Sequence, residues 1–174
     1  MSEEREKLKN QIKEAFAGTP SPDSICDSHE GDEPDLLESE FSGKPDWRTL
    51  DSTLIDLAPD GYGSALSFFS ASAFRYYLPA FLVADLDGKL ERAEPVYHLW
   101  HGLDDETGNE RINPARYGDA TWRTYATERF SCFSIVEVQA IAAYLRFKAR
   151  EDHFSRPQIQ QALNSYWLPR VEPS

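Results

Sequence analysis

Residues 66–86, LSFFSASAFRYYLPAFLVADL, form the most apolar stretch of the chain and decide its fold class. The stretch lacks the strict alternation that marks a half-buried strand, and its length suits a buried helix. Gly88 follows as an expected C-terminal stop. Pro79 has no backbone N–H and its ring crowds the preceding turn. We therefore expect either a kink there or two helices that meet near Leu78.

Apolar residues also recur at helical spacing outside this stretch. They predict helices over residues 2–17, 94–101 and 119–130. In a further short helix, opened by Asp46 and ended by residues 58–61, one face carries Trp47, Leu50, Leu54 and Leu57.

Two helix starts carry capping signals. Ser134 and Glu137 have the spacing of a capping box, and the helix they open is expected to reach Arg150. Ser155 and Gln158 repeat that spacing. The sequence thus predicts an all-α or mainly α protein, a single-domain irregular bundle of five to seven helices over residues 1–174 with long acidic loops. We expect one core to contain Trp47, Phe74, Leu78, Phe81, Leu82, Ile141, Leu145, Leu163 and Trp167.

The chain of 174 residues is strongly acidic, with 30 Asp and Glu against 18 Lys and Arg and a net charge of −12. A field of this sign repels phosphate backbones and anionic headgroups, so nucleic acids and membranes are not expected partners. Between Gly18 and Lys44 there are eight acids and a single base. We expect residues 18–45 to form an acidic, loop-rich segment within the domain.

The longest apolar run, Tyr76 to Ala84, has nine residues with a proline among them, whereas a membrane helix needs about 20. The charged start of the chain predicts no signal peptide. Cys26 and Cys132 form no C-x-x-C pair, which favours a reducing cytoplasm. A disulfide between them stays an alternative, and a functional role for either cysteine stays open.

Two stretches together are similar to a known family. The first is the run from Phe74 to Leu82, with Tyr-Tyr-Leu-Pro-Ala at 76–80 as its most specific motif, and the second runs from Ser134 to Trp167. With the N-terminal helix and Gly43-Lys44, they resemble a family of small bacterial proteins known only as a domain of unknown function. The resemblance implies one domain and a cytoplasmic bacterial setting, and it brings no catalytic residues.

Arg75 lies in an apolar helix, where a guanidinium must reach solvent or find a carboxylate. A structural ion pair or stacking on Tyr76 satisfies this need. A second interpretation is an anion pocket formed by Arg75, Tyr76 and Tyr77.

The sequence contains few groups of residues with the spacing of metal ligands. His98, His101 and Asp104 are spaced by three residues, but Gly102 is expected to end their helix first. The acidic run from His29 to Glu33 lacks the donor spacing of a calcium loop. We also find no nucleophile elbow or phosphate loop. The sequence predicts no metal or cofactor, and catalytic residues and enzymatic activity stay unknown.

The acids Asp32, Glu33, Asp104 and Asp105 are expected to be exposed and to steer a basic protein partner by charge. The leading hypothesis is a non-enzymatic acidic binding protein, an immunity- or antitoxin-type inhibitor or a regulatory adaptor. One alternative is a small hydrolase or metal-dependent enzyme whose site is dispersed in the sequence. Another is a structural subunit of an oligomer, and the oligomeric state itself stays open.

Overall fold

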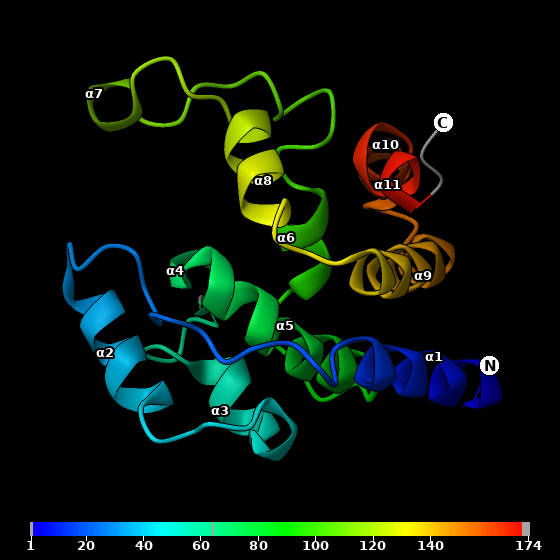
Figure 1. The fold of residues 1–174 in the computed structure, drawn as a ribbon. Helices are drawn as coiled ribbons and strands as arrows, with labels where there is room; N and C mark the ends of the chain where they lie inside the picture. Colours follow the sequence, from blue (N-terminus) through cyan, green and yellow to red (C-terminus); the bar gives the residue numbers. More distant parts are fainter. Residues whose placement is uncertain (1, 64, 172–174) are drawn as a thin grey trace. The chain divides into compact units, whose positions relative to one another are not determined.

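A computed structural model describes residues 2–63 and 65–171 (Figure 1). These residues are mainly helical, and they include isolated bridges but no strand. The predicted mainly helical class is confirmed, but the described residues form more helical segments than five to seven, because several are only one or two turns long. Backbone contacts divide the chain into two compact units, one up to Pro95 and one from Val96.

The first unit is organised around helix α5, Ala71–Leu86, which packs against α1, α3 and a short 3-10 helix, η1. Most α5 side chains are buried, including Leu78, Phe81 and Leu82. The other helices of this unit are α1 (Ser2–Ala15), α2 (Asp32–Phe41), η1 (Trp47–Thr49), α3 (Ser52–Leu57) and α4 (Ala65–Phe68).

The break in the apolar stretch lies before α5 and not at its proline. Helix α5 continues through Pro79, so the alternative of two helices meeting near Leu78 is wrong. Ser70 ends the preceding segment because its hydroxyl accepts a hydrogen bond from Ala73 N at 3.1 Å and donates one to Ser24 O at 2.6 Å. Such a cap fixes the helix start at Ala71.

The single short helix expected after Asp46 is also wrong, because two capping aspartates divide it. The Asp46 carboxylate caps η1, and that of Asp51 accepts from Thr53 N at 2.8 Å and caps α3. The second cap restarts the helical register, so Ile55 is buried while Leu57 is 40% exposed.

A buried carboxylate fixes the chain after α5. Asp56 Oδ1 accepts hydrogen bonds from the backbone N–H groups of Glu91, Arg92 and Ala93 at 2.9–3.0 Å. Burial raises the pKa of Asp56, but these three bonds outweigh it and leave the pKa below its ordinary value. The ionised carboxylate therefore holds residues 91–93 against α3.

The second unit packs its C-terminal helices around Trp167. The Trp167 indole donates to Leu99 O at 2.9 Å, and its ring lies 5.0 Å from that of Phe130. The helical segments here are α6 (Pro95–Trp100), α7 (Pro114–Tyr117), α8 (Trp122–Phe130), α9 (Ile135–Glu151), α10 (Arg156–Ala162), η2 (Leu163–Trp167) and α11 (Leu168–Val171).

The two predicted capping boxes had different outcomes. At α9 the box is confirmed, with Ser134 N donating to Glu137 Oε2 at 2.7 Å and the Ser134 hydroxyl accepting from Glu137 N at 3.4 Å. At α10 the Ser155 side chain makes no capping bond. Asp152 replaces it, because its carboxylate accepts from Ser155 N at 3.1 Å.

The nine residues predicted for one core are all buried, five of them in the first unit and four in the second. A core shared by all nine stays a prediction. Among the described residues, no helix is both long and apolar enough to cross a membrane. Cys26 and Cys132 are free thiols, and the predicted alternative of a disulfide between them is not formed.

Candidate functional site

An acidic surface of the first unit lies on α2, within the segment expected to be loop-rich. Asp32, Glu33 and Asp35 are exposed in its first turn, and the helix contains no basic residue. Leu36 lies among these acids with 41% of its surface exposed. We call Asp32, Glu33, Asp35 and Leu36 the α2 face.

The α2 face is directed outward because the opposite side of the helix is apolar. Pro34, Leu37 and Phe41 recur at helical spacing and are buried. The Phe41 ring lies 5.1 Å from the ring of Phe69 and 4.9 Å from that of Tyr77. These aromatic contacts fix the rotation of α2 about its axis.

The acids also have a structural role, since they lie at the positive end of the helix dipole. Carboxylates in a first helical turn stabilise the helix by about 0.3–1 kcal/mol each. His29 adds local contacts, with Nδ1 3.2 Å from Asp35 Oδ1 and Nε2 3.6 Å from Glu38 Oε1. Both features favour an acidic sequence here without any partner.

Asp104, expected to be exposed, is fully buried, and this part of the prediction is wrong. Its carboxylate accepts from the backbone N–H groups of Glu106 and Thr107 at 3.0 and 2.9 Å and from the Thr107 hydroxyl. Burial raises the pKa of Asp104, and these bonds outweigh it, so the pKa is lowered. Asp104 is thus a structural anchor of its loop.

The loop around Asp104 is closely packed on α8. Gly102 has φ +83°, and a Cβ there would lie 2.7 Å from the carbonyl oxygen of Trp122. Arg123 donates to Asp104 O at 3.1 Å. Asp105 is exposed as predicted, and its carboxylate lies 3.8 Å from Arg123. Only Asp105 of this pair is accessible to a partner.

The tyrosines of the candidate anion pocket are engaged with the backbone. Tyr76 donates its hydroxyl to Pro45 O, and Tyr77 donates to Lys44 O at 3.2 Å. Arg75 is half-buried on the same helix. The tyrosine hydroxyls thus hold the segment before η1, and an anion pocket at these three residues stays a prediction.

Two histidines of the second unit, His98 and His101, lie in an aromatic cluster. His101 stacks on Tyr97, with centroids 4.9 Å apart, and its ring lies 4.8 Å from that of Trp122. Burial, followed by Arg129 and His101, lowers the pKa of His98 to about 3. Within residues 2–63 and 65–171, no three His, Cys, Asp or Glu side chains are grouped to hold a metal ion.

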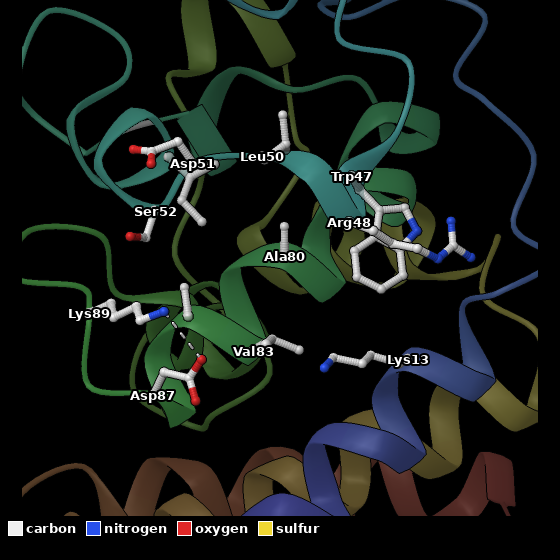
Figure 2. Close-up of a pocket in the computed structure, with 12 residues that line it drawn as sticks. Lys13, Trp47, Arg48, Leu50, Asp51, Ser52, Ala80, Val83, Asp87 and Lys89 are labelled. Carbon is white, nitrogen blue, oxygen red and sulfur yellow. Dashed lines mark ion pairs between the residues drawn. The ribbon is translucent and has the colours of Figure 1, made fainter.

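Sequence reasoning missed a cavity in the first unit, which Figure 2 shows. Its lining comes from α1, η1, α3, α5 and the chain after α5. Because these residues are far apart in the sequence, no local motif could predict the cavity. Lys13 and Val83 lie along one side of it, whereas Asp87 and Lys89 lie along another (Figure 2). The full lining is Lys13, Trp47, Arg48, Leu50, Asp51, Ser52, Ile55, Ala80, Val83, Ala84, Asp87 and Lys89.

These features define a mainly helical protein with an acidic helix face and an open cavity in its first unit. The model of a family of unknown function, DUF6714, matches residues 4–171, and the chain belongs to this family. The expectation of a family of unknown function is confirmed at that level. Neither the curated proteins nor the solved structures contain a match to the chain.

Proposed function

We propose that this chain is a non-enzymatic binding protein that captures a basic protein partner on the α2 face. The observation that carries the proposal is the combination of exposed acids, the absence of any base on α2 and the exposed Leu36. Charge of one sign accelerates the encounter with a partner of the opposite sign. Leu36 then supplies an apolar contact that a purely electrostatic surface lacks.

The overall field of the chain acts in the same direction. Its net charge of −12 favours the approach of a basic protein, and the α2 face concentrates acids near an apolar contact. A basic toxin or regulator masked by this face fits an immunity- or antitoxin-type inhibitor or an adaptor. We also propose that the protein acts in the cytoplasm of a bacterium.

A concave site that gathers Arg75, a histidine and two carboxylates would favour the enzyme alternative. The cavity of the first unit is lined by Arg48, Asp51 and Asp87 but by no histidine. His98 and His101 belong to the second unit. The enzyme alternative and the oligomer alternative both stay open.

Affinity capture from the native host tests the proposal with two variants of equal net charge. The first, Asp32→Asn/Glu33→Gln/Asp35→Asn, removes the charges of the α2 face. The second, Glu3→Gln/Glu14→Gln/Glu91→Gln, removes three exposed acids elsewhere in the first unit. We expect the parent and the second variant to retain the same basic protein and the first variant to lose it. Equal retention by both variants would reject the α2 face.

A further inference from the structure

The cavity of the first unit has the size and lining of a small-molecule site. Its volume is about 520 Å³, within the range of ligand pockets. Apolar side chains form much of its wall, namely Leu50, Ile55, Ala80, Val83 and Ala84. An apolar body placed against these residues is removed from water, which is favourable.

The charges around the cavity leave one cation uncompensated. Asp87 is paired with Lys9 at 2.6 Å and with Lys89 at 3.7 Å. The Arg48 guanidinium lies 3.1 Å from Asp46. Lys13, in contrast, has neither an ion pair nor a hydrogen bond with any described residue.

Asp51 is an acidic residue of the lining, and its carboxylate already accepts hydrogen bonds from the backbone. Asp51 Oδ1 accepts from Thr53 N at 2.8 Å and from Leu54 N at 3.4 Å, so it serves as a helix cap. The chain has a net charge of −12, yet the lining of this cavity includes an arginine and a lysine that has no partner among the described residues. An anionic ligand matches this local charge.

Trp47 supplies an independent observation on the same wall. Its side chain is 97% buried, given a residual exposure of 3%, and its indole Nε1 finds no acceptor among the described residues. A buried donor without an acceptor is costly. The guanidinium of Arg48 lies 4.7 Å from the centre of the Trp47 ring, and both residues belong to the lining of the cavity.

We propose that this cavity binds a small organic carboxylate with an apolar body. The carboxylate lies at Lys13, the cation of the lining that has no ion pair or hydrogen bond with the described residues. The apolar body lies along Val83, Ala80 and Leu50 (Figure 2). This binding is separate from the α2 face and does not depend on it.

Nuclear magnetic resonance on the full chain tests the site with defined probes. The probe is 3-phenylpropionate, its neutral control is 3-phenylpropanamide, and inorganic phosphate tests the anion without an apolar body. The chain has four tryptophans, so the indole N–H of Trp47 is assigned by its loss in Trp47→Phe. We expect the carboxylate to shift this signal with a dissociation constant of about 1 mM or below and the other two probes to bind at least fivefold more weakly.

Three variants locate the binding. Lys13→Gln should weaken the carboxylate at least fivefold, whereas Lys7→Gln removes the same charge from an exposed α1 position outside the lining and should change affinity less than twofold. Val83→Phe fills the cavity and should abolish the Trp47 shift. All three positions are at least partly exposed, so the fold tolerates these changes.

Each contrary result overturns the proposal. Equal affinity for the amide and the carboxylate would show that the charge of Lys13 does not contribute to binding. If phosphate bound as tightly as the carboxylate, the apolar body of the ligand would not contribute to binding. The absence of any Trp47 shift, or equal effects of Lys7→Gln and Lys13→Gln, would show that the cavity is not the site. None of these results bears on the α2 face.

Discussion

Asp104 and Asp105 are identical side chains in adjacent positions, yet one is buried and the other exposed. The difference arises because Asp104 accepts two backbone hydrogen bonds and one from Thr107, which requires its carboxylate to face into the loop. The Asp105 carboxylate is exposed and lies 3.8 Å from Arg123. A count of charges in the sequence cannot separate these roles.

Alanine at each of the two positions tests this assignment. Asp104→Ala leaves buried donors without an acceptor and should lower the free energy of unfolding by roughly 2–3 kcal/mol. Asp105→Ala removes only a weak exposed contact with Arg123 and should change it by less than about 0.5 kcal/mol. Urea denaturation of both variants measures the contrast. Equal destabilisation would contradict the buried role of Asp104.

His98 contributes to the pH dependence of stability in the second unit. Its pKa is lowered to about 3 in the folded chain, from its ordinary value of 6.5, mainly because burial disfavours the charged ring. The unfolded chain therefore binds a proton at a higher pH than the folded chain. This contribution to stability is complete above pH 6.5 and is lost progressively as the pH falls from 6.5 towards 3.

A proton titration followed by nuclear magnetic resonance checks this assignment. The ring signals of His98 should stay unchanged between about pH 8 and 5, because the ring remains neutral throughout this range. His98→Gln should reduce the loss of stability on acidification by up to about 1.4 kcal/mol per pH unit below the unfolded pKa. A His98 titration midpoint near 6.5 would refute the burial of this ring.

At the scale of the element, α2 is positioned by its apolar side and presents its acidic side. Leu37 is fully buried, whereas the adjacent Leu36 is 41% exposed. The helix was not expected, because the many acids of residues 18–45 and their low hydrophobicity favoured a loop. The apolar spacing of Pro34, Leu37 and Phe41 was the available signal, and it covers barely two turns.

The two leucines provide a matched test of the α2 register. Leu37→Ala should lower the free energy of unfolding by about 2–5 kcal/mol, because it leaves a cavity in the packed interior. Leu36→Ala should change it by less than about 0.5 kcal/mol while weakening partner capture. Thermal and urea denaturation measure the first contrast. A larger loss from Leu36→Ala would place the wrong side of α2 inward.

The helix ends show why prediction succeeds in some places and fails in others. At α9 the Ser134 and Glu137 pair is local, so its geometry could be predicted from four residues of sequence. At α10 the same spacing does not form a capping box, because Ser155 N donates its hydrogen bond to the Asp152 carboxylate, just after α9. Competing side chains from the preceding segment decide such cases.

At the scale of the whole molecule, the fold class and the buried residues could be predicted, since helical periodicity and apolar content depend on the sequence alone. The cavity could not, because Lys13, Trp47 and Val83 come from three elements that only tertiary packing brings together. The same holds for the three amides that converge on Asp56.

The net charge of −12 produces a long-range field, and the α2 face determines where that field guides a partner. Added salt weakens the attraction due to the net charge and to the acids of the α2 face, because the Debye length falls from about 10 Å at 0.1 M to about 3 Å at 1 M. Short-range apolar contacts are affected much less. Electrostatic capture slows with added salt mainly through the association step. Apolar contacts at Leu36 act mainly on dissociation.

The most direct test is therefore the association rate constant of the captured partner, measured against ionic strength for the parent, the neutralised α2 variant and the equally charged control. We predict a steep fall with salt for the parent and the control, slower and less salt-dependent association for the α2 variant, and smaller changes in dissociation. An α2 variant that associates as fast as the parent, with the same salt dependence, would contradict binding through the α2 face.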